Sequence, residues 1–415
     1  MSAIKQGYKQ TKVGIIPQDW EVVKLGKIGD LIGGGTPSTK NEEFWNGNIP
    51  WISSSDLNEN NIYDISISRF INEQAIKNSA TKLIPNKSIL IVSRVGVGKI
   101  AINNKPLCTS QDFQSLILKK DNHIFLAYKI KNEIQKLIAC NQGTSIKGFV
   151  KEDLSNLQIP LPPLKEQEKI AEILTTWDEA ITKQTELLEA KELQKKALMQ
   201  KLLSGEVRFD GFSDKWEEVR LGEIGEFKTS SIDKIINENE SLVNLINYMD
   251  VYRNKHIDKN FRCSKTSLKE EQYEKVNLKK GDILFTPSSE TPDDIGHSAV
   301  IIEDLPNTVY SYHLVRFRPK KSIDLKFSGY VFNNIDILKE FAKRANGSTR
   351  FTLSIKDFNE TKAKLPSLLE QHKIAEVLSL VDDEINLLKN ELEELKLQKK
   401  ALMQKLLTGE VRVKV

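Results

Sequence analysis

Few residues of this chain have the types and spacing that catalysis needs. The segment 96–100 (GVGKI) is similar to the end of a nucleotide-binding P-loop, whose backbone N–H groups hold phosphates and whose last hydroxyl binds magnesium. The chain has Ser93 where that loop needs its first glycine, and Ile100 where it needs serine or threonine. These two mismatched residues argue against a nucleotide-binding site.

Two further patterns fall short of an active site. Asp293 after Pro292, with the later segment 324–326 (DLK), loosely matches the carboxylates and lysine of a metal-dependent nuclease, but the spacing is long and Pro-Asp is a common turn pair. Pro162-Pro163 lacks the neighbouring polar and aromatic residues that hold a flipped base in a DNA methyltransferase. The histidines are isolated in the sequence: His123, His256, His297, His313 and His372. We predict no catalytic residue and no metal site, and a single-chain nuclease is the best enzymatic alternative.

Composition predicts a multidomain cytoplasmic protein. A chain of 415 residues is too long for one ordinary core. Cys108, Cys140 and Cys263 are too widely spaced for a metal site or a disulfide framework, which fits a reducing cytoplasm. The N-terminus lacks the apolar core of a signal peptide, and no apolar run approaches the ~20 residues of a membrane span. Basic residues outnumber acidic ones in residues 1–160, which permits phosphate binding.

A long internal repeat shows how the chain is organised. Residues 161–209 and 365–413 are identical at 29 of 49 aligned positions, at a constant offset. Each copy carries apolar residues with heptad spacing, interrupted in the first by Gln184, Lys191 and Lys195 and in the second by Lys399. We expect two helices of ~60 Å that pack as an antiparallel pair, ending at Gly205 and Gly409.

Two dissimilar stretches precede the repeated helices. Each opens with a related phrase, WEVVKLGKIGD from Trp20 and WEEVRLGEIGE from Trp216, that predicts a strand and a turn. Short β-prone runs follow, and a helix closes each stretch, at 123–140 and at 328–345. The predicted fold is α+β, with two mostly β modules and a pseudo-twofold repeat of the helices. The predicted domains are 1–160, 161–208, 209–364 and 365–415.

Polar residues of the repeat recur as closely as its apolar ones. A coiled coil needs only apolar spacing, yet QKKALMQKLL is the same in both copies. The recurrence favours two equivalent docking sites for two copies of one partner over a purely structural coiled coil. The predicted partner-binding residues are Gln194, Lys195, Lys196, Gln200, Lys201, Gln398, Lys399, Lys400, Gln404 and Lys405.

Several long motifs resemble those of one family, the specificity subunits of type I DNA restriction-modification systems. The similar segments cover both halves of the chain: 33–57, 93–102, 143–167, 201–209 and 281–300. The resemblance implies that each module is a target recognition domain for one half of a split, asymmetric DNA site. It also implies that the helices form a spacer between the half-sites.

The resemblance implies partners as well. Two methyltransferase subunits would dock on the spacer, and restriction and translocase subunits would complete the complex on double-stranded DNA. No membrane is involved. The chain itself would hold no cofactor, whereas S-adenosylmethionine, ATP and magnesium would bind the partner subunits.

Base and phosphate contacts need hydrogen-bonding side chains in loops that enter a groove. In the first module the candidates are Thr36, Ser38, Lys40, Ser53, Ser54, Ser55, Arg94, Lys99, Ser110, Gln111, Asp112, Ser145 and Lys147. In the second module they are Lys228, Thr229, Ser230, Arg253, Lys255, Ser288, Ser289, Glu290, Thr291, His313, Arg344, Ser348 and Arg350. The best clusters are 53–55, 94–99 and 288–291. A coiled-coil adaptor that binds only proteins remains the non-enzymatic alternative.

Overall fold

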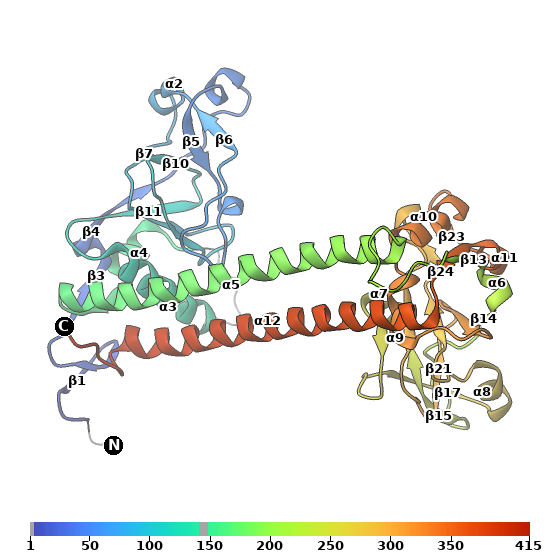
Figure 1. Cartoon of the computed structure of the whole chain (residues 1–415). Helices are drawn as coiled ribbons and strands as arrows, with labels where there is room; N and C mark the ends of the chain where they lie inside the picture. Colours follow the sequence, from blue (N-terminus) through green and yellow to red (C-terminus); the bar gives the residue numbers. More distant parts are fainter. Residues whose placement is uncertain (1–3, 141–147) are drawn as a thin grey trace. The chain divides into compact units, whose positions relative to one another are not determined.

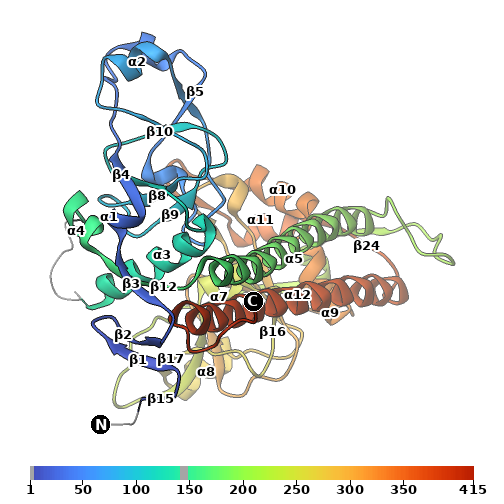
Figure 2. The same ribbon diagram turned by 90° about the vertical axis from the view of Figure 1, so that its left-hand side faces the viewer.

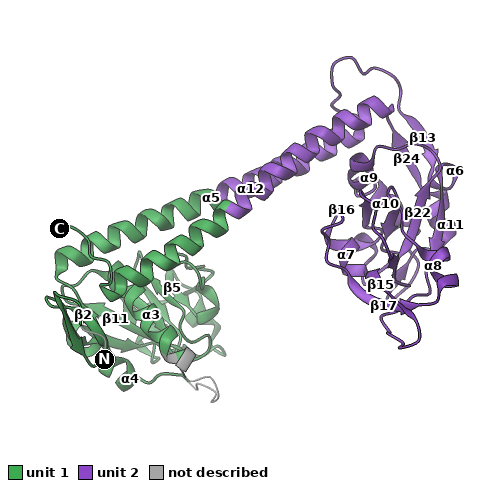
Figure 3. Ribbon diagram, turned by 90° about the horizontal axis from the view of Figure 1, so that it is seen from below, with its two compact units in different colours: residues 1–185, 391–415 green, residues 186–390 purple. Residues whose placement is uncertain are grey.

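The computed structural model describes residues 4–140 and 148–415, and the chain forms two compact units. Unit 1 comprises residues 1–185 and 391–415, and unit 2 comprises residues 186–390. Figure 3 colours the units and shows that each contains one globular module and part of both long helices. None of the helices in the described ranges is long and apolar enough to cross a membrane.

Unit 1 is built on two four-stranded sheets. Its strands are β1 (Tyr8–Thr11), β2 (Gly14–Pro17), β3 (Glu21–Lys24), β4 (Gly29–Gly33), β5 (Ile49–Ile52), β6 (Arg69–Ile71), β7 (Leu83–Ile84), β8 (Ile89–Val92), β9 (Ile100–Ile102), β10 (Leu107–Thr109), β11 (Phe113–Leu118) and β12 (Gln158–Leu161). Its helices before the first long one are α1 (Leu25–Ile28), α2 (Glu73–Lys77), α3 (His123–Cys140), α4 (Lys151–Asn156) and the 3-10 helices η1 (Glu42–Trp45) and η2 (Ser54–Asp56).

The sheet nearer to the long helices has the order β4-β11-β8-β9 and is antiparallel throughout. The other, β6-β5-β10-β7, contains one parallel pair and lies farther from the long helices, as Figures 1 and 2 show. The core of the unit joins the first sheet to α3 and to both long helices, through Phe125, Ile130, Ile170, Leu174 and Leu406.

Unit 2 is built on a five-stranded and a three-stranded sheet, with orders β14-β22-β18-β20-β16 and β17-β15-β21. Its strands are β13 (Glu217–Arg220), β14 (Gly225–Thr229), β15 (Ser241–Ile246), β16 (His256–Ile257), β17 (Ser264–Leu268), β18 (Ile283–Phe285), β19 (Ser288–Ser289), β20 (Ser298–Ile301), β21 (Thr308–Tyr310), β22 (Val315–Pro319), β23 (Phe351–Thr352) and β24 (Lys362–Leu365). Its helices are α6 (Leu221–Ile224), α7 (Tyr248–Arg253), α8 (Glu270–Val276), α9 (Leu325–Val331), α10 (Ile335–Arg344), α11 (Ile355–Glu360) and the 3-10 helix η3 (Pro292–Asp294). Its main hydrophobic cluster holds seven buried phenylalanines: Phe227, Phe285, Phe317, Phe327, Phe332, Phe341 and Phe358.

A common frame holds both modules. In unit 1, β3 pairs with β12, and Gly26 of α1 lies against Ser155 of α4, where a Cβ atom would meet the serine Oγ at 2.2 Å. In unit 2, β13 pairs with β24, and Gly222 of α6 lies in the same way against Asn359 of α11. The related phrases at Trp20 and Trp216 therefore form a strand and one helical turn that carry each module onto its long helix.

The two long helices are α5 (Leu164–Ser204) and α12 (Leu368–Thr408), each of 41 residues. They are antiparallel, because the first half of α5 packs with the second half of α12 in unit 1, and the remaining halves pack together in unit 2. Figure 1 shows them side by side. Gly205 and Gly409 both have φ +75°, the left-handed conformation that ends a helix. The predicted antiparallel pair and its glycine ends are confirmed.

The predicted helix 328–345 is wrong in one respect. The segment forms two helices, α9 and α10, separated at Phe332, Asn333 and Asn334. The Asn333 side chain donates to the carbonyls of Ser298 and Gly329, and these bonds hold the chain in the turn between the helices. The equivalent segment 123–140 of unit 1 is the single predicted helix α3.

A buried glutamate at the start of α5 binds the end of α12. The Glu166 side chain is 1% exposed and accepts hydrogen bonds from Trp20 Nε1 at 3.0 Å and from Arg412 Nε at 2.6 Å. Arg412 also pairs with Asp19, and this contact lowers the pKa of the Asp19 carboxyl. The residues that follow α12 are thereby fastened to the first module.

Unit 2 repeats this arrangement with the helices exchanged. Glu370, near the start of α12, is 1% exposed and accepts bonds from Arg208 at 2.8 Å and from Trp216 Nε1 at 3.2 Å. We refer to the two groups, Glu166–Trp20–Arg412 and Glu370–Trp216–Arg208, as the glutamate clamps. They give a structural reason for the repeated EQ and GEVR segments at the two ends of each helix.

A buried lysine predicts a pH-dependent stability. Lys129 on α3 is 1% exposed, pairs with Glu133 and donates to the Leu407 carbonyl at 2.7 Å; burial lowers its pKa to about 8. Between pH 8 and the ordinary lysine pKa, the unfolded chain binds more protons than the folded one, so stability rises with pH. We expect the free energy of unfolding of the wild type, relative to Lys129→Met, to rise by about 2 kcal/mol between pH 7.5 and 9.5. Urea denaturation at both values tests this, and a constant difference would contradict it.

Candidate nucleic-acid interface and docking face

Four loops of unit 1 meet on one polar surface, which we call the Ser53 surface: residues 34–40, 53–56, 94–99 and 110–112. The Thr36 hydroxyl donates to Gln111 Oε1, and Ser93 donates through its backbone N–H to the Asp112 carbonyl at 2.7 Å. Lys99 Nζ donates to the carbonyls of Ser54 and Leu57, each at 3.3 Å. The structure therefore brings together residues from four separate predicted stretches.

The GGG segment 33–35 owes its composition to close packing. A Cβ atom at Gly34 would lie 2.1 Å from the Ser110 carbonyl oxygen, and one at Gly35 would lie 2.5 Å from the backbone of Ala80 and Thr81. The Gly35 carbonyl accepts a hydrogen bond from Trp51 Nε1 at 3.0 Å. These contacts position the following loop, with Thr36, Ser38 and Lys40, beside Gln111.

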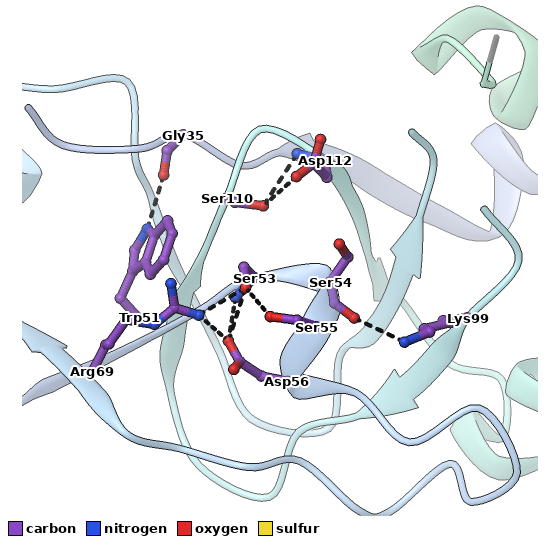
Figure 4. A network of polar contacts seen from close by, with 10 residues as sticks. All are labelled: Gly35, Trp51, Ser53, Ser54, Ser55, Asp56, Arg69, Lys99, Ser110 and Asp112. Atoms are coloured by element: carbon purple, nitrogen blue, oxygen red, sulfur yellow. Dashed lines mark hydrogen bonds and ion pairs between the residues drawn. The ribbon is translucent and has the colours of Figure 1, made fainter. Parts of the chain in front are cut away.

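An arginine that sequence reasoning missed organises the Ser53 surface. Arg69 donates to Ser53 Oγ at 2.7 Å, pairs with Asp56, and stacks with its guanidinium 4.7 Å from the Trp51 ring centroid (Figure 4). Ser53 Oγ also lies 2.9 Å from Ser55 Oγ. Arg69 is 39% exposed, so it combines an ordered position with access to solvent. In the sequence, Arg69 could have been recognised only as an arginine that begins a strand shortly after the serine cluster 53–55.

The predicted contact residues of unit 1 divide into two groups. Ser54 and Ser110 are buried, and Lys99 is bonded to backbone carbonyls, so these residues support the loops. Another group is exposed: Thr36, Ser38, Lys40, Ser55, Arg94 and Gln111. Arg94 is exposed and makes no hydrogen bond or ion pair to any residue in the described ranges. Ser145 and Lys147 lie outside the described residues.

Unit 2 carries a second polar surface, the Ser288 surface, formed by residues 248–253, 288–297, 312–313 and 348–352. Arg350 Nη2 donates to Ser288 Oγ at 3.2 Å, and Tyr248 donates to the Ser288 carbonyl at 2.8 Å. The pairing of β19 with β23 sets Ser288 opposite Thr352. Glu290, Thr291 and Ser348 are exposed beside these contacts, whereas Ser289 is buried.

Aromatic residues of the Ser288 surface were also missed by sequence reasoning. Tyr252, which is 37% exposed, donates to the Asp294 carboxylate, and His297 lies 2.9 Å from the same group. The Tyr312 ring is 53% exposed and lies 3.9 Å from the His313 ring. Burial, Arg350 and Lys234 together lower the pKa of His313, so its imidazole is neutral near pH 7. Lys228, Thr229 and Ser230 lie on and after β14, which pairs with β22 just beyond His313.

Two predicted contact residues are engaged by other parts of unit 2. Lys255 is half-buried beside the long helices, with Nζ 5.4 Å from the Tyr330 ring centroid and 3.6 Å from Met199 Sδ, and burial lowers its pKa to about 8. Arg344 ends α10 and pairs with Glu340 and Glu360. Arg253 is exposed at the end of α7, next to Tyr252.

The repeated helix segments present matching exposed faces. Leu193 is 70% exposed and Leu397 at the equivalent position is 61% exposed. The same neighbours are exposed around each leucine: Gln194, Lys196, Ala197, Gln200 and Lys201 in α5, and Gln398, Lys400, Ala401, Gln404 and Lys405 in α12. We call these two sets the repeated docking faces. Each combines an apolar centre with polar and basic residues.

Lys195 and Lys399, two of the predicted partner-binding residues, are half-buried rather than exposed. Their side chains are 15% and 11% exposed, and they pair with Asp382 and Asp178 respectively. The sequence analysis placed them both among the interruptions of the apolar seam and among the partner-binding residues. The long lysine side chain reconciles the two, because its stem packs in the seam while its ammonium group reaches a carboxylate.

Described ranges hold no cluster of three or more His, Cys, Asp or Glu side chains that could bind a metal. The two aspartates of the loose nuclease match lie in ordinary structural positions. Asp324 caps α9 by accepting from the Phe327 N–H, and Asp293 is exposed in η3.

Comparisons with known proteins agree with the fold in both halves of the chain. A family model described as the type I restriction modification DNA specificity domain matches residues 17–192 and again 213–397. The type I restriction enzyme MjaIX specificity subunit of Methanocaldococcus jannaschii is 28% identical, over 98% of this chain and 96% of that protein. The EcoR124I/EcoR124II specificity subunit of Escherichia coli is 35% identical over 39% of this chain and 41% of its own length.

Solved structures show the same fold. A chain from "Structural basis underlying complex assembly and conformational transition of the type I R-M system" has a TM-score of 0.65 at 18% identity, covering 95% of this chain and 99% of that one. The HsdS subunit from Thermoanaerobacter tengcongensis has a TM-score of 0.52 at 19% identity, covering 95% of this chain and 98% of that one. The resemblance seen in the sequence is therefore confirmed over both halves, and the chain belongs to the type I restriction-modification DNA specificity family, with one copy of the family's domain in each half.

Proposed function

We propose that this chain is the DNA-recognition subunit of a type I restriction-modification complex and reads a bipartite, asymmetric site. The observation that carries the proposal is the pairing of a twice-matched specificity domain with two unlike polar surfaces. The Ser53 surface is built around an arginine, serines and an exposed Arg94, whereas the Ser288 surface is built around tyrosines, histidines and an acidic residue. Different hydrogen-bonding groups select different base edges, so the two half-sites differ in sequence.

The chain supplies recognition, and partner subunits supply the chemistry. One methyltransferase subunit docks on each of the repeated docking faces, and the equal faces account for two copies of the same partner. Restriction and translocase subunits join this assembly on double-stranded DNA. S-adenosylmethionine, ATP and magnesium bind those partners, and the chain itself is not an enzyme.

Methylome sequencing tests the proposal. A host expresses this chain with the methyltransferase subunit encoded beside it, and a control host expresses the methyltransferase alone. The expected result is methyladenine in two unlike short sequences separated by a fixed gap, only when this chain is present. Soluble, associated proteins that add no methylation would favour a protein-binding adaptor. DNA cleavage by the chain with magnesium alone would favour the nuclease alternative.

Arg94 gives a prediction for one half-site. Replacing Arg94 with alanine removes a bidentate donor from the Ser53 surface, and one such base contact is worth about 1–3 kcal/mol of discrimination. We expect methylation to fall roughly tenfold or more and the motif to relax at one position of one half-site, with the other half-site unchanged. Methylome sequencing of the variant measures both effects.

Lys120→Ala is the matched control for Arg94→Ala. Lys120 is exposed and follows β11, whereas the 110–112 loop of the Ser53 surface precedes that strand, so the control removes a charge at the opposite strand end. Equal losses in both variants, or a loss at both half-sites of the Arg94 variant, would show that Arg94 does not read bases.

A further inference from the structure

A polar cluster interrupts the apolar seam of unit 1. Tyr128 of α3 donates its hydroxyl proton to Asp178 of α5, and Lys399 of α12 pairs with the same carboxylate. Lys399 Nζ also lies 2.9 Å from the Tyr128 hydroxyl and 4.6 Å from the ring centroid. Asp178 is 13% exposed and Lys399 is 11% exposed. One cluster thus joins the globular module to both long helices.

Unit 2 contains an equivalent cluster with the helices exchanged. Tyr330 of α9 donates to Asp382 of α12 at 2.7 Å, and Lys195 of α5 pairs with that carboxylate. Burial disfavours the ionised form of Asp382, yet the bonds from Lys195 and Tyr330 hold its pKa below the ordinary value. The Asp382 carboxylate is therefore charged at neutral pH, and the Lys195 ammonium group compensates its charge.

The two clusters recur at matching positions of the repeat. Asp178 and Asp382, like Lys195 and Lys399, are separated by the constant offset of the two copies. Other seam polar residues lie in more exposed contacts, such as the pair of Lys191 with Glu384, whose side chains are 30% and 46% exposed. In each Tyr–Asp–Lys cluster, both long helices and a module share one secluded polar contact.

Buried ion pairs of this kind are weak evidence for a role in stability. Moving a carboxylate and an ammonium group out of water costs about as much as their attraction returns, and well-packed apolar residues in their place are often equally or more stable. Polar groups inside an apolar helix interface have a better-supported effect on register, because a shifted pairing leaves a charge buried without its partner. Leucine-rich heptads alone discriminate poorly between neighbouring registers.

We propose that the two Tyr–Asp–Lys clusters are positioning elements that hold each recognition module at one register on the helix pair, and so restrict the chain to one gap length between half-sites. This inference rests on the proposed function. The scale is appropriate, because a slip of one heptad is ~10 Å along a helix, or about three base pairs of DNA. A smaller shift of ~3.4 Å corresponds to about one base pair.

The test replaces the cluster of unit 1 with apolar residues of similar size. The triple variant carries Tyr128→Phe, Asp178→Leu and Lys399→Met, in the full chain expressed with its methyltransferase subunit. The substrate is a plasmid library in which the two half-sites are separated by every gap within a few base pairs of the natural one. Sequencing reports the methylation at each gap, and thermal unfolding reports the stability.

We expect the triple variant to unfold at the wild-type temperature or above it. We also expect its methylation at gaps about three base pairs longer or shorter, relative to methylation at the natural gap, to be roughly tenfold higher than that of the wild type. A purely structural contact would not change this ratio. Lys396→Met is the matched control, since it removes an exposed lysine one turn away that pairs with Glu393. It is expected to leave the ratio unchanged.

Several results would overturn the inference. The first is an active triple variant that discriminates between gap lengths as the wild type does. The second is a marked fall in its unfolding temperature, because the cluster would then act through stability. If the triple variant assembles no complex, the single variant Tyr128→Phe is measured in its place. Unchanged discrimination between gap lengths in that variant would again reject the positioning role. A wild-type chain that directs no bipartite methylation at any gap would instead reject the proposed function.

Discussion

Replacing both exposed leucines of the repeated docking faces, Leu193→Asp and Leu397→Asp, is expected to abolish DNA methylation directed by this chain. The two leucines are 70% and 61% exposed, and a carboxylate in either place would be buried unpaired under a docked partner. Central apolar anchors of an interface contribute about 2 kcal/mol or more each, which is roughly a thirtyfold loss of affinity per face. The module surfaces and the helix seam are untouched, so DNA binding by the isolated chain is expected to persist.

The single variants separate the two faces. Leu193 lies in unit 2 and Leu397 in unit 1, so each single variant is expected to keep one methyltransferase copy, measured by the mass of the purified complex. Leu187→Asp with Leu387→Asp is the matched control, because these leucines are 44% and 58% exposed on the same helices. The other copy of the repeat carries Glu391 and Lys183 at their positions, so they belong to no repeated face. Equal losses in control and test would contradict the docking assignment.

Arg412→Met is expected to lower the free energy of unfolding by about 3 kcal/mol. The substitution leaves the Glu166 carboxylate, which is 1% exposed, with only Trp20 as a partner. Removing one member of a buried ion pair typically costs about 3–5 kcal/mol, and the 36% exposure of Arg412 places the effect at the low end of that range. The loss also releases the residues after α12 from the first module. Urea denaturation followed by tryptophan fluorescence measures the effect.

The second glutamate clamp provides the comparison. Arg208→Met removes the matching contact with Glu370 in unit 2 and is expected to destabilise that unit by a similar amount. Arg412→Lys keeps the charge but loses the two-pronged geometry, so an intermediate loss is expected. A change below about 0.5 kcal/mol for Arg412→Met, the size of an ordinary surface substitution, would show that water satisfies Glu166 in its place.

Local patterns in the sequence predicted the repeated elements well. Heptad spacing and the glycines at 205 and 409 predicted both long helices and their ends, because helix periodicity and left-handed glycine caps depend only on nearby residues. The same reasoning failed at 332–334, where Asn333 bonds to Ser298 in a distant strand. A tertiary contact of that kind leaves no periodic signal.

The polar surfaces show a similar division. Sequence reasoning selected Thr36, Ser53 and Gln111 by residue type and loop position, and the structure brings them onto one surface. It missed Arg69, whose place beside Ser53 depends on the pairing of β5 with β6. Whether these side chains contact bases stays a prediction. Strand pairing between segments far apart in the chain decides which hydrogen-bonding groups share a surface.

By itself, the sequence determined the two-module organisation, the repeated helices and the family, because repeats and motifs are read directly from residue order. Only the tertiary structure decided which carboxylates the buried lysines of the repeat reach. Heptad spacing already placed Lys195 and Lys399 in the apolar seam, but only the structure shows that each pairs with an aspartate of the opposite helix. That choice depends on the antiparallel register, which places Asp382 and Asp178 opposite them, and register is a property of the packed helices.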